Sequence, residues 1–167
     1  MSKSRFPCVF LILVICTLSV SCGRNKYPPG FPKIYPIRLQ IVQEGTPLDA
    51  ASVALIAEDP SLKKWPSGGR TDAQGMVNIQ THGFDGAPIG NYKVTVVKVV
   101  REGGFKTVEE ADEAFLKGIE DPGVDYSYVE ECCNSAETTP LTLEVKKKNG
   151  DDAVVLDAGQ AVKEALN

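Results

Sequence analysis

The chain has 167 residues, of which 43% are hydrophobic and 24% are charged, with a net charge of −4 and a single histidine. This length suits one domain with a buried core. The acidic balance makes nucleic acid and anionic lipid surfaces poor partners. One histidine does not build the usual zinc site, and we expect neither a metal nor a cofactor.

The first 21 residues are typical of a bacterial export signal. Lys3 and Arg5 precede an uncharged apolar run, Phe6–Val20, which is too short for a comfortable transmembrane helix and ends in small residues. The junction LSVS-Cys22-Gly then resembles a lipoprotein box, in which a peptidase cuts before a cysteine that carries lipid. We therefore expect residues 1–21 to be removed and Cys22 to be the lipidation site.

A lipid on Cys22 would make the membrane a partner of the mature chain. A diacylglycerol plus an N-acyl chain anchors stably, unlike a single acyl chain. Ser19 departs from the leucine that is usual three positions before the cysteine, which leaves ordinary cleavage and secretion as an alternative. Gly23, in place of an inner-membrane retention Asp, favours the outer membrane. Residues 22–33 then form the lipidated end and a proline-rich tether, and the mature chain has 16 basic and 22 acidic residues, net −6.

The body of the chain begins with four predicted strands, over residues 34–42, 51–57, 76–81 and 91–100. In each, apolar residues alternate with polar or small ones, which is typical of strands with one buried face. In the first strand Ile37, Leu39 and Ile41 form the expected buried face. In the following strands one face is shared by Val53 and Leu55, by Val77 and Ile79, and by Tyr92, Val94 and Val96. A loop over 58–69, a turn over 71–75 and a glycine-rich connection over 82–90 separate the strands.

The pattern then changes to a helical period. Thr107 and Glu110 form the signature of a capping box, and apolar residues at helical spacing predict a helix over 108–119 with Val108, Ala111, Phe115 and Ile119 on one face. Strands resume at 141–145 and 153–156. Because Asn149-Gly150 lies between them, we expect a hairpin. The tail 158–167 has apolar residues at helical spacing and predicts a C-terminal helix.

Short strands separated by turns predict a mainly β fold, an Ig-like or transthyretin-like antiparallel sandwich over residues 34–157. The helix at 108–119 would be an insertion in it, and residues 158–167 a helical tail.

Three stretches in order carry a family resemblance. They are Ile41 to Val53, "I-x-x-x-G-x-P-L-x-x-A-x-V", Thr71 to Val77, "TDAQGMV", and Asp85 to Val96, "DGAPIGNYKVTV". The order resembles the carboxypeptidase regulatory-like, or transthyretin-like, domains found in small lipoproteins of planctomycetes and related bacteria. The resemblance covers residues 35–100 and continues more weakly to 156. It implies an Ig-like sandwich, an exported location and no established catalysis.

The glycines and acids between these strands have two readings, as turn residues or as a binding loop. Asp72, Gly75, Asp85 and Gly86 are residue types that turns require, and the turn reading is favoured. Glycines that cradle a phosphate precede a helix, whereas these precede strands. His82 lies among them, but no G-x-S-x-G elbow occurs, so we expect no catalytic residue there.

Cys132 and Cys133 are adjacent, in the stretch VEECCNS. Outside the cytoplasm thiols tend to oxidise, and three states remain open: a strained Cys132–Cys133 disulfide, intermolecular bonds, or free thiols. A soft-metal site would need further ligands.

These observations predict a non-enzymatic, lipid-anchored protein of the cell envelope that serves binding, assembly or spacing, with a protein or a glycan as partner. One alternative is a carbohydrate- or peptide-binding module, in which Trp65, Tyr126 and Tyr128 converge at one end of the sandwich. Another is an enzyme with a minimal site near His82 or the Cys132–Cys133 pair.

Overall fold

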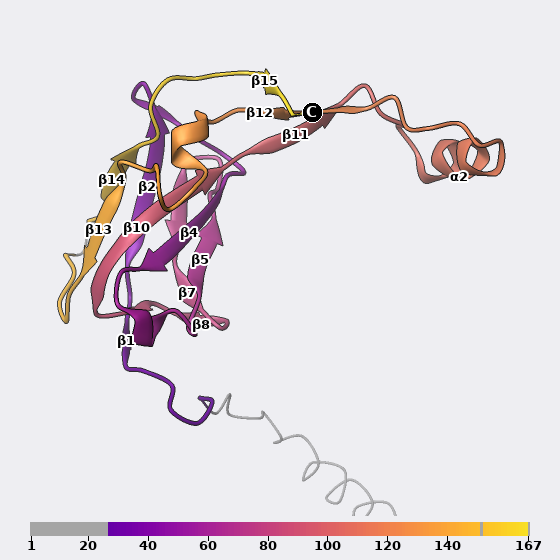
Figure 1. Ribbon diagram of the computed structural model, residues 1–167. Helices are drawn as coiled ribbons and strands as arrows, with labels where there is room; N and C mark the ends of the chain where they lie inside the picture. The colour runs from indigo at the N-terminus through magenta and orange to yellow at the C-terminus, as the bar shows by residue number, and fades with distance from the viewer. Residues whose placement is uncertain (1–26, 151, 167) are drawn as a thin grey trace, which may run out of the picture. The chain divides into compact units, whose positions relative to one another are not determined.

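The computed structural model describes residues 27–150 and 152–166 (Figure 1). The pattern of contacts between residues divides the chain into two units, residues 1–31 and residues 32–167. The second unit contains every strand and helix given below. The expected signal and the lipidation site Cys22 lie outside the described residues.

The larger unit is mainly β, with one α-helix and two short 3₁₀ helices. The strands of its first half are β1 (Ile34–Tyr35), β2 (Arg38–Gln43), β3 (Thr46–Pro47), β4 (Ser52–Ala57), β5 (Ser67–Arg70), β6 (Met76–Asn78), β7 (Gln80–Thr81), β8 (Phe84–Asp85) and β9 (Ala87–Pro88). The second half has β10 (Gly90–Val97), β11 (Val99–Glu102), β12 (Val124–Ser127), β13 (Thr142–Val145), β14 (Val154–Asp157) and β15 (Glu164–Ala165). The helices are η1 (Pro60–Leu62), α2 (Val108–Leu116) and η2 (Glu131–Cys133).

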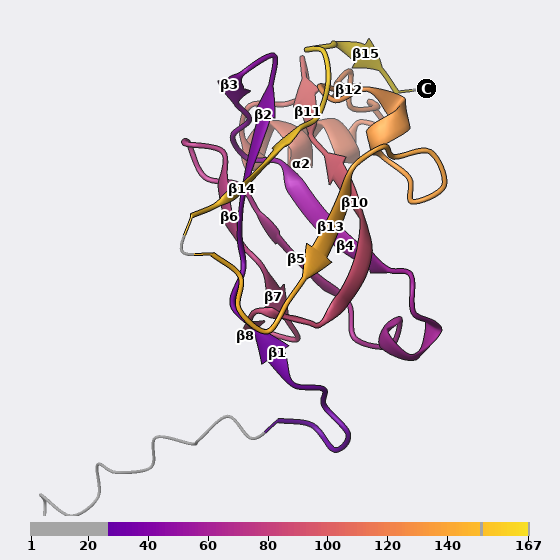
Figure 2. The ribbon, with the colours of Figure 1, turned by 90° about the vertical axis from the view of Figure 1, so that its left-hand side faces the viewer.

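Two sheets face each other across the core. The larger has the strand order β13-β10-β4-β5-β7-β8, and the smaller has β14-β2-β3 with β6 also paired to β2. Figure 2, turned from the view of Figure 1, shows β14 and β2 of the smaller sheet on the left and β13 and β10 of the larger sheet on the right. The predicted β-sandwich is therefore confirmed. A third sheet, β11-β12-β15, which we call the ribbon, continues from the end of β10.

The core lies between the inner faces of the two sheets. The expected buried face of Ile37, Leu39 and Ile41 has 6% or less of its surface exposed. The structure shows that the faces shared by Val53 and Leu55, by Val77 and Ile79, and by Tyr92, Val94 and Val96 are also buried, each residue with 3% or less exposed. Tyr92 is the largest of the core side chains, and its hydroxyl donates to the Pro88 carbonyl at 2.8 Å. Burial raises the pKa of Tyr92 to about 12, which agrees with a phenol that stays neutral inside the sandwich.

The strand predicted over residues 76–81 is two strands that belong to different sheets. β6 pairs with β2, whereas β7 pairs with β5. Ile79 lies between them, and its carbonyl accepts from the Gly86 amide at 2.8 Å instead of joining a ladder. The alternation of Val77 and Ile79 continues across the break, so the hydrophobic pattern could not reveal it.

The predicted hairpin around Asn149-Gly150 is wrong. β13 pairs with β10, while β14 crosses to the other sheet and pairs parallel with β2, Leu156 opposite Ile41. The Asn149 side chain accepts from the Lys146 amide at 2.9 Å and donates to the Pro36 carbonyl at 3.1 Å. These bonds fix the chain as it leaves one sheet for the other.

The predicted C-terminal helix is also absent from the described residues 158–166. Ala158 is fully buried, and its amide donates to the Val42 carbonyl at 2.8 Å, which extends the chain along β2. Glu164 and Ala165 then form β15 against Ser127 and Tyr126. The tail forms a strand on the open edge of β12 although its apolar residues have helical spacing. Pairing with β12 satisfies backbone groups that would otherwise face only water.

The inserted helix is confirmed over Val108–Leu116. Thr107 caps it as predicted, and its hydroxyl accepts from the Glu110 amide at 3.1 Å. Glu110 reaches back one residue further than the motif predicts, to the Lys106 amide at 2.9 Å. The helix connects β11 to β12, whose register starts at Glu102 opposite Val124.

Gly75 offers a test of the turn before β6. Its φ is +70°, and a Cβ there would collide with the backbone carbonyl of Ile41. We expect Gly75→Ala to lower the free energy of unfolding by about 2 kcal/mol or more, through conformational strain plus the collision. Urea unfolding followed by fluorescence measures this.

Gly45 is the matched control. It has a similar φ of +76°, but a Cβ there meets nothing within 4 Å. Gly45→Ala should therefore cost only the conformational part, about 1 kcal/mol. Equal losses for the two variants would contradict the close packing of Gly75 against β2.

Candidate functional site

The ribbon carries a polar cluster that joins three distant parts of the sequence. The Glu102 carboxylate accepts from the Tyr128 hydroxyl and from Lys163 Nζ, the latter at 2.7 Å. Lys163 Nζ also lies over the rings of Tyr126, at 4.5 Å, and Tyr128, at 5.9 Å. The cluster fastens the C-terminal tail to the ribbon.

Electrostatics within this cluster favour its charged form. The hydrogen bond from Lys163 holds the pKa of Glu102 below its usual value, and the bond from Tyr128 lowers it further. The same carboxylate raises the pKa of Lys163 and of the Tyr128 phenol. Each group thus keeps its ordinary protonation state more firmly, which is the behaviour of a structural ion cluster and not of groups prepared to exchange protons.

A groove lies beside the ribbon, between η2 and the C-terminal tail. It measures ≈ 770 Å³, and we call it the η2 groove. Polar side chains and the end of β15 line it, among them Ser127, Cys132, Asn134, Ser135, Thr138 and Glu164. Asn134 Oδ1 is buried and accepts no hydrogen bond within the described part of the chain.

The two cysteines lie on η2 at the edge of this groove. Both are free in the structure, with their Sγ atoms 3.9 Å apart. Cys133 is buried and its thiol faces the Ala158 carbonyl at 3.7 Å, whereas Cys132 is half-buried and faces Glu130 Oε2 at 3.7 Å. Burial, followed by the neighbouring Cys132, raises the pKa of the Cys133 thiol to about 12. The disulfide between the pair stays a prediction.

His82 lies on a different element from the cysteines. It occupies the turn between β7 and β8, with a positive φ of +51° and an exposed side chain. Its ring meets the edge of Trp65, with centroids 5.3 Å apart. The two alternative locations for a minimal enzyme site, His82 and the Cys132–Cys133 pair, therefore lie on different elements.

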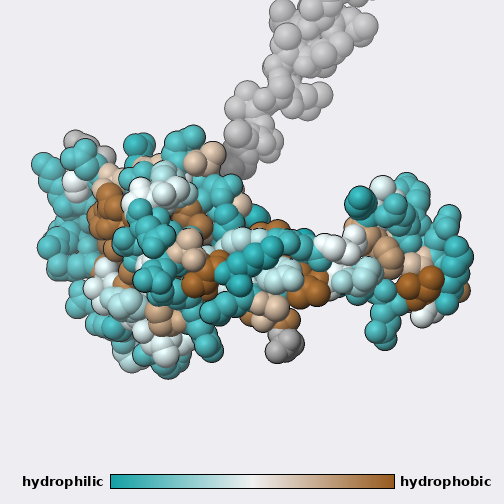
Figure 3. All heavy atoms as spheres, turned by 90° about the horizontal axis from the view of Figure 1, so that it is seen from above, coloured by the Kyte–Doolittle hydropathy of each residue, from teal (hydrophilic) through white to brown (hydrophobic). Residues whose placement is uncertain are grey.

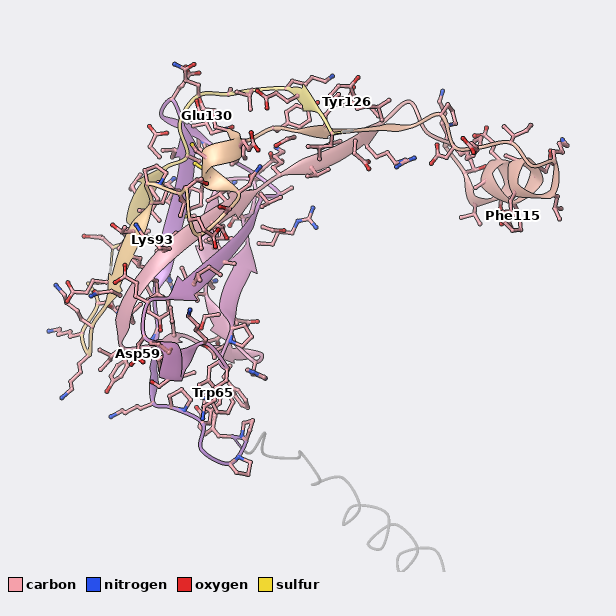
Figure 4. All side chains as sticks on the ribbon, in the orientation of Figure 1. Asp59, Trp65, Lys93, Phe115, Tyr126 and Glu130 are labelled. Atoms are coloured by element: carbon pink, nitrogen blue, oxygen red, sulfur yellow. The ribbon has the colours of Figure 1, made fainter. Side chains whose placement is uncertain are left out.

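The three aromatic residues expected to converge at one end of the sandwich lie in two separate places. Tyr126 and Tyr128 are near Lys163 on the ribbon, while Trp65 is beside His82. Figure 4 shows Trp65 and Tyr126 at opposite ends of the sheets. The three rings are therefore too far apart to stack on one carbohydrate at the same time.

The turn residues behave as the sequence indicated. Asp72 Oδ1 accepts from the amides of Gln74 and Met76, each at 2.9 Å, so its carboxylate is used within the turn. Asp85 Oδ1 accepts from Gln80 Nε2 at 2.9 Å, across the β7–β8 pair. Neither acid is directed at a binding site.

The helix α2 presents an apolar surface that the rest of the described chain does not cover. Val108 is 73% exposed, Phe115 84%, Leu116 83% and Ile119 56%. Phe115 and Ile119 line a hollow of ≈ 630 Å³ together with Phe105, Ala111 and three acids, Asp112, Glu120 and Asp121. Figure 3 shows hydrophobic atoms at the surface of α2, on the right of the view, and Figure 4 labels Phe115 there. We call these six apolar residues the α2 surface.

Sequence reasoning placed Val108, Ala111, Phe115 and Ile119 on one helical face, but nothing in the pattern indicated that the face would be open. The Glu102–Tyr128–Lys163 cluster had no signal at all, since its members are separated by 26 and 61 positions. Only the pairing of β12 with β11 and β15 brings them together.

Within the described residues, no group of three or more His, Cys, Asp or Glu side chains is arranged to hold a metal ion. No helix of that part of the chain is long and apolar enough to cross a membrane. A scan against protein-family models, a search of curated proteins and a search of solved structures each gave no match for this chain.

The two thiols should differ in reactivity. Alkylation requires the thiolate, so Cys133, with its pKa raised to about 12, should stay unmodified by iodoacetamide near pH 8 while the protein is folded, and should react after denaturation. Cys132 is the more accessible sulfur and should react first. The reduced protein is labelled for set times, and peptide mass spectrometry then measures the fraction of each cysteine that is alkylated. Equal labelling of the two cysteines in the folded protein would contradict the buried position of Cys133.

Proposed function

We propose that this protein is an exported, lipid-anchored and non-enzymatic component of the cell envelope that works by assembly with another protein through α2. The observation that carries the proposal is the exposure of the α2 surface, where Phe115 and Leu116 leave more than four fifths of their area in contact with water.

An exposed apolar surface of this kind favours a partner for energetic reasons. Burying a side chain such as Leu or Phe contributes about 1.5–3 kcal/mol. Four of the six residues of the α2 surface line one hollow, so a partner could bury them together. The helix is also short. With nine residues, it falls below the length of about 12–15 at which isolated helices become stable in water. A partner that covered the surface would stabilise both the side chains and the helix.

The anchor and the family belong to the same proposal. Support for the anchor comes from the apolar run Phe6–Val20 that ends at Cys22 and from the proline-rich stretch that follows. For the carboxypeptidase regulatory-like or transthyretin-like family, the support is the motif order from Ile41 to Val96, which agrees with a β-sandwich. The anchor would hold the domain at a membrane, where partners are concentrated, and the outer membrane is the expected location.

The intact mass of the mature protein from membranes of its host checks the anchor. We expect a chain that begins at Cys22 and carries a diacylglycerol and an N-acyl chain. Replacing Cys22 by Ser should release the protein from the membrane fraction, while Cys132→Ser should not. An unlipidated soluble species from the wild-type gene would overturn the anchored part of the proposal.

Photo-crosslinking tests the assembly role. A benzophenone amino acid in place of Phe115 should form an adduct with one defined protein in intact membranes, because the side chain is 84% exposed and open to a partner. The same probe at Lys63, which is exposed elsewhere, is the matched control. Leu116→Asp in the probe-bearing chain should reduce the adduct at least about threefold by placing a charge in an apolar contact. A probe at Phe115 that yields no protein adduct would refute assembly through α2.

A further inference from the structure

We infer that the partner of α2 is a second copy of this chain, and that it receives the helix in a basic groove at the other end of the sandwich. This inference rests on the proposed function and names the occupant of the α2 surface.

The basic groove lies where the crossover after β13 passes the start of β2. It measures ≈ 420 Å³, and its walls combine three apolar or aromatic residues with three cations, Tyr35, Pro36, Ile37, Arg38, Lys147 and Lys148. In the described part of the chain, none of these three cations forms an ion pair. Lys33 adds a further charge, with its Nζ over the Tyr35 ring at 5.4 Å.

The α2 segment has the opposite character. From Phe105 to Asp121 it contains six acidic and two basic residues, a net charge of −4. Three acids line the same hollow as Phe115 and Ile119. Asp121 is paired with Arg101 at 3.0 Å, whereas Asp112 and Glu120 form no ion pair in the residues that the structure describes. One surface therefore offers apolar side chains bordered by carboxylates, and the other offers a hollow bordered by cations. Complementary charge at the border of an apolar contact favours this pairing over other arrangements.

The two surfaces cannot meet within one molecule. Gly90, at the start of β10, lies opposite Val145, which leads directly into the crossover at the basic groove. The chain then runs through β10 and β11 to Glu102, after which α2 begins. Twelve residues of strand span about 40 Å, so the helix and the groove lie at opposite ends of this path. One copy's helix can reach only another copy's groove.

This contact joins different surfaces of the two copies, so one contact by itself is head-to-tail. It closes into a pair if each copy's helix occupies the other's groove, and otherwise it produces larger rings or rows. The area is small, since a hollow and one short helix fall well short of the roughly 1,600 Å² of a stable interface. We therefore expect weak association in solution, with a Kd of micromolar to millimolar order, and stronger association where anchored copies are concentrated on a membrane.

The test uses two distinguishable full-length chains in the same membranes. One carries the benzophenone probe at Phe115, and the other is tagged and has no probe. We expect an adduct between them, with the attachment mapped by mass spectrometry to residues 35–38 or 147–150 of the tagged chain. Charge reversal in the groove, Lys147→Glu with Lys148→Glu, should reduce this adduct at least about threefold, because it replaces attraction by repulsion at the border.

A charge swap supplies the decisive arm. Asp112→Lys with Glu120→Lys in the probe-bearing chain should likewise reduce the adduct with a wild-type groove and restore it with the reversed groove. The matched control is Lys63→Glu with Lys64→Glu in the tagged chain, which makes the same charge change on an exposed site after η1 and should leave the adduct unchanged. All four positions in the swap are exposed, so the variants should fold, and circular dichroism checks this.

The outcomes separate this inference from the proposed function. An adduct between the probe and a different protein would overturn self-assembly while the assembly role stood. An adduct between copies that mapped outside the basic groove, or a swap that failed to restore it, would overturn the groove as the receiving surface. The absence of any protein adduct, with the probe attached only to lipid, would overturn both.

Discussion

The fold depends on the position of β10, which lies between β4 and β13 and is paired along both edges. Because strand side chains alternate, this placement directs Tyr92, Val94 and Val96 into the core while the opposite face stays partly exposed. A one-residue slip of β10 would move all three out of the core and open the two adjacent ladders at once. Its register is therefore the most strongly determined in the sandwich.

The same strand determines what leaves the core. β10 is followed almost immediately by β11, so the chain continues past the sandwich in the same direction and needs a partner strand there. β12 supplies it on one edge, and the tail adds β15 to the free edge of β12. The 21 residues between Glu102 and Val124 then have no sheet to join. They contain the helix α2 with its exposed apolar side chains.

The C-terminal part closes the structure by long-range contacts. β14 completes the smaller sheet by parallel pairing with β2, and the chain then passes over the groove beside η2. Gln43, at the end of β2, is buried, and its Nε2 donates to the carbonyls of Tyr128 at 3.0 Å and Gln160 at 3.2 Å. One side chain thus joins the sandwich, the ribbon and the tail. Because these elements are tied together, the ion cluster at Glu102 and the cysteines on η2 are held on fixed backbone.

The sequence by itself determined the mainly β fold, the residues that share a face in each of the first four strands and the capped helix after Thr107. These are local properties, since alternation, turn residues and a cap act within a few positions of the chain. Tertiary structure alone decided the break at Ile79, the crossover of β14 to β2 and the extended tail. Each of these depends on which strand edge remains open, and a periodic pattern contains no record of edges far away in the sequence. The same limit applies to the candidate sites: Phe115 and the lysines of the basic groove could be seen as apolar or basic residues, but their exposure and their separation followed only from the path of β10 and β11.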